Sequence, residues 1–280
     1  MSIDIYKLES GITTQESGFS KPGISLDEIT RQLPQGLYST FRTFGGAQKV
    51  LGLQSHFDRL FGPAEIAGII TSASEYELRQ SLRKLLGPYQ SSEARVRISV
   101  SLSEKPGLVF IAIEPLKLLD ATIYQNGVKL VTSHIERSNP RLKTTGFISK
   151  SEIERKTILQ NGIFEAVMVH NNQILEGLTS NFYTVKGQKI ISARKGILLG
   201  VTRRAVLRLA RVNGFSIDYR ALGVEEIPWV DEAFITSSSR GVVPVVEIDG
   251  IAVGQGMVGG VVKSLIIAYD SYVIKNAETI

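Results

Sequence analysis

The chain of 280 residues contains no cysteine. This absence excludes disulfide bonds, cysteine-ligated zinc, iron–sulfur clusters and cysteine nucleophiles. Histidine is also scarce, since only His56, His134 and His170 occur and they lie far apart in the sequence. We therefore expect surface or helix-capping histidines, and neither a metal site nor a Ser–His–Asp triad.

Long apolar runs are missing as well. Residues 250–262 form the longest uncharged stretch of apolar character, but it is glycine-rich and shorter than the roughly 20 residues that a membrane-spanning helix needs. The amino terminus mixes acids and a lysine with short apolar residues, which is not the layout of a signal peptide. We expect a cytoplasmic protein that makes no membrane contact.

Positive charge exceeds negative charge, with 32 Lys and Arg against 27 Asp and Glu and a formal net charge of +5. The basic residues are scattered and form no RNA-binding signature, so we expect no nucleic-acid partner. The excess is a weak indication of anionic ligands. With 43% apolar and 21% charged residues, the composition is that of a globular protein and not of a disordered one.

Several motifs of known chemistry do not occur. The sequence has no GxxxxGK[ST] phosphate loop, no GxGxxG after a strand, no HExxH and no GxSxG. P-loop, dinucleotide-binding, zinc-protease and serine-hydrolase chemistry of these common types is therefore not indicated.

Hydrophobic periodicity predicts an α+β fold with a small domain over residues 1–120 and a larger domain over residues 121–280. Predicted strands cover residues 3–8, 37–44, 94–102, 107–113, 164–169, 181–185, 189–192, 233–236 and 242–248, and predicted helices cover residues 54–61, 76–86, 151–161, 202–212 and 261–275. Strands and helices do not alternate strictly, which favours two layers over a doubly wound parallel sheet. Residues 114–127 are the expected linker, and Thr202 is the expected cap of its helix.

The strand over residues 94–102 alternates clearly. Its even-numbered residues are apolar, so Arg95 and Arg97 share the opposite face. We expect both arginines to point outward, where they either bind a carboxylate or face solvent.

Six segments, taken in order, are similar to those of a known family. They are GLYSTFRTFGG at 36–46, HFDRL at 56–60, NPRLK ending at Lys143, FEAVMVHNNQILEGLTSNFYTV at 164–185, LLGVTRRAV at 198–206 and DEAFITSSSRGVVPVVEIDG at 231–250. The set resembles the class IV, or fold type IV, pyridoxal-phosphate enzymes, which include branched-chain and D-amino-acid aminotransferases and aminodeoxychorismate lyase. EGxxSN and GVTR are its most specific elements.

The resemblance implies a two-domain enzyme of the D-amino-acid aminotransferase type that binds pyridoxal 5'-phosphate. It also implies a homodimer whose active site lies between the domains, with the larger domain holding the cofactor. Lys143 is then the lysine that binds the cofactor as a Schiff base and carries the proton from the substrate Cα to the cofactor C4′. Lys150 and Lys156 are alternatives, and a solvated surface lysine is the plain reading of each.

The remaining cofactor residues follow from the same resemblance. Glu176 is expected at the pyridine nitrogen, where its charge favours the protonated ring, and Asn181 is expected to support it. Taken alone, these two residues read as a turn acid and a turn asparagine.

The phosphate is expected to contact Arg59, the backbone amides of Val201 and Thr202 at a helix amino terminus, and Ser238. Arg59 could instead pair with an acidic neighbour on its helix, and the three consecutive serines could form only a polar loop.

The substrate is expected to contact Tyr38, Arg97, Ser239 and Arg240. Some features depart from the family pattern: residues 144–148 read TTGFI after the lysine, Leu178 follows EG, and the YxRPL-like motif of branched-chain enzymes is replaced by ARVRIS.

We therefore predict an aminotransferase acting on a D- or a small or branched-chain L-amino acid and a 2-oxo acid. The alternatives are an aminodeoxychorismate lyase and a non-catalytic relative that binds the cofactor or another ligand.

Overall fold

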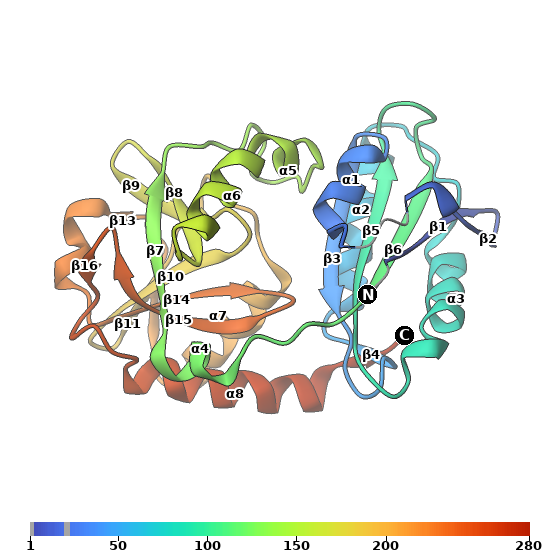
Figure 1. Ribbon diagram of the computed structural model, residues 1–280. Coiled ribbons are helices and arrows are strands. Elements are labelled where there is room, and N and C mark those ends of the chain that lie inside the picture. Colours follow the sequence, from blue (N-terminus) through green and yellow to red (C-terminus); the bar gives the residue numbers. More distant parts are fainter. Residues whose placement is uncertain (1–2, 20–22) are drawn as a thin grey trace. The chain divides into compact units, whose positions relative to one another are not determined.

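The computed structural model describes residues 3–19 and 23–280, and the chain forms two compact units (Figure 1). Unit 1 comprises Met1–Lys117, Leu142–Lys150 and Asn276–Ile280, and unit 2 comprises Leu118–Arg141 and Ser151–Lys275. Both units combine helices with sheets, which confirms the predicted α+β class. The observed division differs from the predicted one because residues 142–150 and 276–280 group with unit 1.

Unit 1 is built on a five-stranded antiparallel sheet with the order β2-β1-β6-β5-β3. The strands are β1 (Asp4–Glu9), β2 (Ile12–Gln15), β3 (Gly36–Arg42), β5 (Ala94–Ser101) and β6 (Val109–Pro115). The helices are α1 (Leu26–Gln32), α2 (Leu53–Ile66), α3 (Glu75–Leu85) and α5 (Gly146–Lys150), and short 3-10 turns cover Ser17–Phe19 and Gly87–Tyr89. The predicted strands and helices of this region are present.

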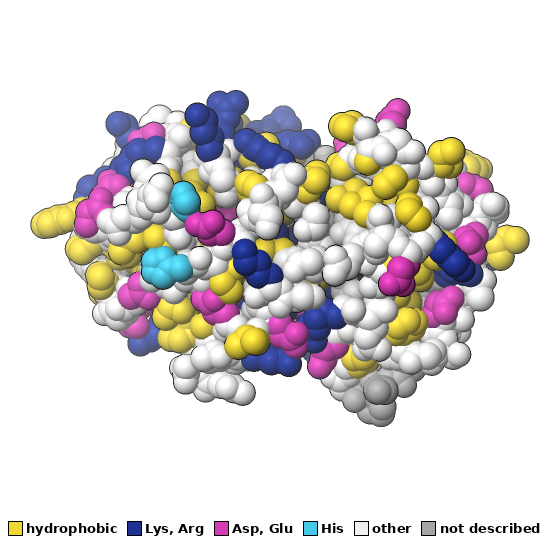
Figure 2. All heavy atoms as spheres, turned by 90° about the horizontal axis from the view of Figure 1, so that it is seen from above, with side chains coloured by type: hydrophobic (Ala, Val, Ile, Leu, Met, Phe, Trp, Pro, Cys, Tyr) yellow, Lys and Arg dark blue, Asp and Glu magenta, His cyan; other side chains and the backbone are white. Residues whose placement is uncertain are grey.

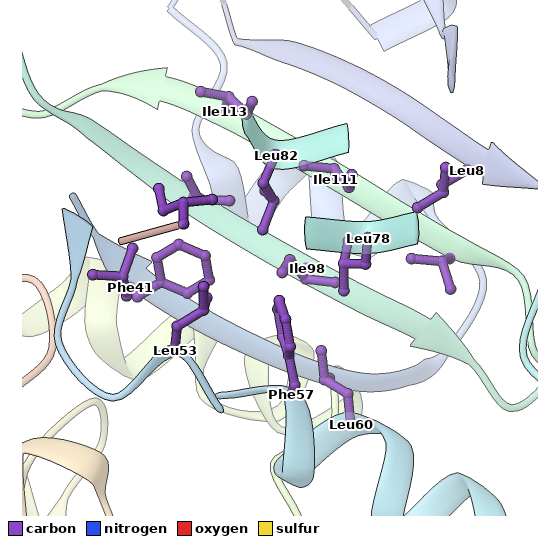
Figure 3. Close-up of a cluster of buried hydrophobic side chains, with 14 of the residues drawn as sticks. Leu8, Phe41, Leu53, Phe57, Leu60, Leu78, Leu82, Ile98, Ile111 and Ile113 are labelled. Carbon is purple, nitrogen blue, oxygen red and sulfur yellow. The ribbon is translucent and has the colours of Figure 1, made fainter. Parts of the chain in front are cut away.

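Apolar side chains on one face of this sheet pack against α2 and α3 (Figure 3). Phe57 and Leu60 of α2 and Leu78 and Leu82 of α3 face the side chains of the strands, and all four are fully buried. Alternate strand residues make a smaller cluster with α1 on the other face. The side-chain alternation of the strands therefore supplies two cores, one on each side of the sheet.

Helix α1 was not predicted, although its start carries a clear signal. Ser25 accepts a hydrogen bond from the backbone of Glu28, and the Glu28 carboxylate accepts one from the backbone of Ser25, which is a complete capping box. The helix has only seven residues, so its apolar periodicity is too short to stand out.

Two short segments join unit 1 from later in the chain. Thr144 forms a bridge with Leu37 beside β3, and the Lys143 carbonyl accepts the Tyr38 amide at 2.8 Å. At the other segment, β17 (Glu278–Thr279) pairs with β4 (Lys49–Val50). Local periodicity cannot reveal backbone pairing between distant segments. The predicted domain boundary at 120/121 therefore assigned both segments to the larger domain.

Unit 2 contains a ten-stranded mixed sheet. Its strands are β7 (Val128–Ser133), β8 (Glu165–His170), β9 (Gln173–Gly177), β10 (Asn181–Lys186), β11 (Lys189–Ile191), β12 (Ser216–Asp218), β13 (Leu222–Gly223), β14 (Glu232–Ser237), β15 (Gly241–Ile248) and β16 (Ile251–Ala252). The main order is β12-β11-β10-β14-β15-β7-β8-β9-β13, and β9 also pairs with β10. That extra pairing closes β10, β14, β15, β7, β8 and β9 into a ring.

The helices of unit 2 are α4 (Ala121–Asn126), α6 (Glu152–Gln160), α7 (Val201–Val212) and α8 (Gly260–Asn276), with a 3-10 turn over Val224–Trp229. The unit boundary at 117/118 falls inside the predicted linker, residues 114–127, and Asp120 caps the short helix α4 within that segment, which was not predicted. The expected cap of α7 was wrong. Gly200 occupies the N-cap, whereas Thr202 lies inside the first turn and is buried.

Within residues 3–19 and 23–280, no helix has both the length and the apolar character required to cross a membrane.

Replacing Phe57 by alanine should destabilise unit 1 strongly. Its ring is fully buried between α2 and the sheet, so we expect the free energy of unfolding to fall by about 3–5 kcal/mol. Urea unfolding followed by circular dichroism measures the change. Ile66→Ala on the same helix is the control, because Ile66 is 89% exposed and its loss should cost little. Equal losses in the two variants would contradict this packing.

Candidate active site

The site features of unit 2 begin where its ring of strands closes. β9 and β10 pair at one position, and the residues opposite each other there are Glu176 and Asn181. Paired residues of neighbouring strands hold their side chains close together, and Asn181 Nδ2 donates to Glu176 Oε2 at 3.0 Å. The two residues expected to act together are therefore in contact.

The Glu176 carboxylate is buried and held by at least three donors. Besides Asn181, the Leu198 amide donates to Oε2 at 3.0 Å and Arg137 Nε donates to Oε1 at 3.2 Å. Both side chains of the Arg137–Glu176 ion pair are nearly inaccessible to solvent. A buried carboxylate with an arginine and two further donors is a fixed negative charge. The sequence analysis missed Arg137, which no local motif distinguishes.

Asn181 connects this carboxylate to the start of α7. Its Nδ2 also donates to the Leu198 carbonyl at 2.7 Å, and a Cβ added at Gly200 would lie 2.3 Å from Asn181 Oδ1. Only glycine fits this close approach. The contact fixes where α7 begins, immediately before Val201 and Thr202.

The first turn of α7 can bind an anion. Among the described residues, no side-chain hydrogen bond caps this end of the helix. The first amides of a helix have no carbonyl partner within it, and the helix dipole favours negative charge there. The amides of Val201 and Thr202 are thus placed as expected for phosphate binding.

The serine loop joins β14 to β15 and holds Ser238, Ser239 and Arg240, all partly buried. Arg240 anchors it: Nε donates to Ser237 Oγ at 3.0 Å, and the Arg240 carbonyl accepts the Tyr124 hydroxyl at 2.8 Å. The loop therefore has a fixed conformation.

Arg240 also forms an ion pair that the sequence analysis did not foresee. Its Nη2 lies 2.8 Å from Glu165 Oε2 and 2.7 Å from Thr179 Oγ1. Glu165 is buried and also accepts the Thr179 amide at 2.6 Å and Ser180 Oγ at 2.9 Å. Glu165, in the FEA segment at 164–166, thus connects the serine loop to the turn that follows Glu176. Arg240 uses Nε and Nη2 for these hydrogen bonds within the protein.

Unit 1 contains Lys143, which is partly buried and lies beside β3, held there by backbone hydrogen bonds. Its ammonium lies 5.0 Å from the centre of the Tyr38 ring, a cation–π distance. Of the alternatives, Lys156 pairs with Glu152 on the surface of α6 and has a side chain 63% exposed, and Lys150 is exposed. The surroundings of Lys143 differ most from those of a solvated lysine.

His56 and Arg59 lie one turn apart on α2 of unit 1. His56 is fully buried, which corrects the expectation of surface or capping histidines for this residue, whereas His134 is exposed. His56 Nδ1 lies 2.8 Å from Ser39 Oγ, and its buried Nε2 has no partner among the described residues. Burial lowers the pKa of His56 well below its usual value, and the charges of Arg59 and Lys143 lower it further. The imidazole is therefore neutral.

Arg97 does not face solvent, which was one of the two alternatives expected for it. It is buried under α1, where Nη1 donates to Asp27 and Thr30, each at 2.7 Å, and Nε donates to Thr40 Oγ1 at 2.9 Å. Its guanidinium also lies 4.9 Å from the centre of the Tyr38 ring. The solvent-facing alternative is wrong because helix α1, which was not predicted, covers this face of the sheet. Arg97 thus helps to fix the Tyr38 ring.

The surface distributes charge unevenly. Lys and Arg side chains gather in one part of the face shown in Figure 2 (dark blue, upper left), whereas acidic side chains are more dispersed over it. A local excess of positive charge favours the approach of anionic molecules. This agrees with the indication of anionic ligands from the net charge.

Comparison with known proteins agrees with this geometry. The family model described as amino-transferase class IV matches residues 36–248. The D-alanine aminotransferase of Bacillus licheniformis is 28% identical over 275 residues, which cover 93% of this chain and 96% of that protein. The branched-chain-amino-acid aminotransferase of Pseudomonas aeruginosa is 28% identical over 262 residues, covering 87% and 85%.

The fold matches solved structures over nearly its whole length. The branched-chain aminotransferase of the thermophilic archaeon Thermoproteus uzoniensis, solved with norvaline, has a TM-score of 0.77 at 21% identity, and the match covers 99% of this chain and 96% of that one. The fold is therefore that of the fold type IV aminotransferases. The chain belongs to the class IV aminotransferase family, and it is an enzyme of that family.

The buried His56 should make stability depend on pH in a defined direction. Above pH ~6.5 both folded and unfolded states hold it neutral, so it contributes nothing to the pH dependence. Below that pH the unfolded chain gains a proton that the folded protein excludes. The free energy of unfolding should then fall by up to about 1.4 kcal/mol per pH unit through this group.

Urea unfolding measured between about pH 5 and 7.5 tests this linkage. His56→Gln should flatten the slope by up to one proton, whatever its effect on stability at neutral pH. His134→Gln, which changes an exposed histidine, should leave that slope component in place. An unchanged slope in His56→Gln would disprove the assignment.

Proposed function

We propose that this protein is a pyridoxal-phosphate-dependent aminotransferase that exchanges an amino group between an amino acid with a small or branched aliphatic side chain and a 2-oxo acid. The observation that carries the proposal is the buried Glu176 carboxylate, held by Arg137, Asn181 and the Leu198 amide in a chain of the class IV family. Relatives named D-alanine and branched-chain aminotransferases support the reaction and the substrate range.

The residues present fit the cofactor. Glu176 provides a fixed negative charge for the pyridine nitrogen, and Asn181 holds it in place. The amides of Val201 and Thr202 and the Ser238 hydroxyl, all of unit 2, are proposed as donors for the phosphate, and Arg59 of unit 1 is proposed as a further one. When bound, pyridoxal phosphate supplies an electron sink that accepts the charge left on the substrate Cα.

Lys143 is proposed as the catalytic residue. Its Nζ would hold the cofactor, and as a free amine Nζ would be the group that carries the proton of the substrate Cα. The Tyr38 ring lies beside this amine and limits its positions. The Glu176 carboxylate would favour the protonated form of the pyridine nitrogen.

Substrate recognition is assigned to Tyr38, Arg97, Ser239 and Arg240. Two of the Arg97 nitrogens are occupied within the protein, so Nη2 is the atom proposed to meet a carboxylate. Arg240 donates internally through Nε and Nη2, which leaves Nη1 for the same purpose. Because both guanidiniums are anchored, they would offer a carboxylate donors at fixed positions.

We expect the enzyme to act in the cytoplasm as a homodimer in which the partner contributes a loop to the active site. The absence of cysteine is compatible with that compartment. Size-exclusion chromatography with light scattering tests the dimer.

Reduction with borohydride should attach the cofactor permanently to Lys143. The purified protein should be yellow, and after reduction and proteolysis the mass of pyridoxal phosphate should appear on the peptide containing that lysine. Lys143→Ala should lose the label and about 10²–10⁴-fold of the activity, the usual contribution of a positioned acid–base group. Lys156→Ala, a change on the surface of α6, should keep both. A wild-type protein that ignores added cofactor would exclude the proposal.

The absorption spectrum of the bound cofactor should identify the amino donor. D-alanine and the L branched-chain amino acids are added one at a time, and the donor shifts the spectrum without any oxo acid present. A suitable 2-oxo acid should then restore it. Release of pyruvate from aminodeoxychorismate with no oxo-acid requirement would instead show a lyase, and the absence of any response across the panel would show a non-catalytic relative.

A further inference from the structure

Arg203 is a buried cation in the first turn of α7. Only 5% of its surface is exposed. Its Nη2 donates to the Ala193 carbonyl at 2.7 Å and lies 3.5 Å from Ser192 Oγ, while its buried Nε has no partner among the described residues. The proposed function gives this residue no role.

Among the described residues, no carboxylate lies within 4 Å of this guanidinium, so Arg203 forms no direct ion pair. Its neighbours are the rings of Tyr183 and Tyr219, with centres 6.0 and 5.7 Å away. Burial raises the pKa of Tyr183, so its hydroxyl stays neutral. Arg194 and Arg211 also approach the Tyr219 ring, at 5.4 and 5.8 Å, and add positive charge.

An arginine cannot lose its proton, and a buried charge without a counter-charge is costly. The cost falls if an anion binds nearby. Arg203 directly follows Val201 and Thr202, whose amides open α7, and one helical turn rises only about 5.4 Å. An anion held by those amides would therefore lie within the range over which a poorly screened charge acts.

We propose that Arg203 is a positioning residue of the phosphate site, whose buried charge makes the start of α7 selective for a dianionic phosphate group. The inference rests on the proposed function, because it takes the phosphate of the cofactor as the ligand. Arg203 acts through the field at the helix start and through its bond to Ala193, which ties α7 to the end of β11. It does not need to touch the phosphate.

The test compares the affinities of the protein for pyridoxal phosphate and for pyridoxal, which lacks the phosphate. Arg203→Gln should weaken binding of the phosphorylated form roughly tenfold or more, as expected for one charge lost at short range in a protein interior, and binding of pyridoxal by less than about threefold. Arg203→Lys keeps the charge and should restore most of the wild-type ratio. Arg208→Gln removes one exposed charge from the same helix and is the matched control.

The outcomes separate a specific role from a structural one. If Arg203→Gln weakens both ligands equally, or if Arg208→Gln changes the ratio as much, the inference is wrong. If Arg203→Gln does not fold, Arg203→Lys decides: a wild-type ratio supports the role of the charge, and a lost ratio overturns it. A wild-type protein that binds neither ligand would refute the proposed function and with it this inference.

Discussion

A buried carboxylate is the constraint on which unit 2 depends. Glu176 lies where a ring of strands closes, and removing its charge from water is tolerable only because Arg137, Asn181 and the Leu198 amide donate to it. Those donors come from three separate segments. The requirement to satisfy one acid therefore fixes the closure of the sheet, the path into α7 and the position of Gly200 together.

The same principle organises the rest of the chain. Glu165 binds both Arg240 of the serine loop and the Thr179 amide in the turn after β9. Asp27 of α1 pairs with Arg97 of β5. Glu165 is buried, and Asp27 is partly buried against the buried Arg97; each joins segments that are distant in the sequence. Such pairs add little net stability compared with apolar packing, but they allow only one arrangement of the backbone.

Much of the fold could be predicted from the sequence. Periodic segments such as α3 and β5 are long enough to show which face is buried, and the capping signals of α3 follow known rules. The short helices α1 and α4 were missed because seven residues or fewer carry too little helical periodicity. Without α1, the sequence could not show that Arg97 is buried and paired with Asp27.

The candidate site was predictable only as far as linear motifs extend. Glu176 and Asn181 stand in one EGxxSN element, so their contact follows from a hairpin. The partners Arg137 and Glu165 could not be found, because their pairing depends on strand order and not on spacing. The burial of His56 could not be predicted either. The position of a histidine on a helix does not show whether its ring will contact another side chain, here Ser39, or solvent.

The path of the chain has a practical meaning. It passes between the two units four times, at 117/118, 141/142, 150/151 and 275/276, so neither unit is a continuous piece of sequence. No single cut separates them, and a fragment that ended at residue 117 would lack two later segments of unit 1, Leu142–Lys150 and Asn276–Ile280. Lys143 lies in a nine-residue segment, Leu142–Lys150, between two of these crossings, so its surroundings are built from parts of the chain that are distant in the sequence.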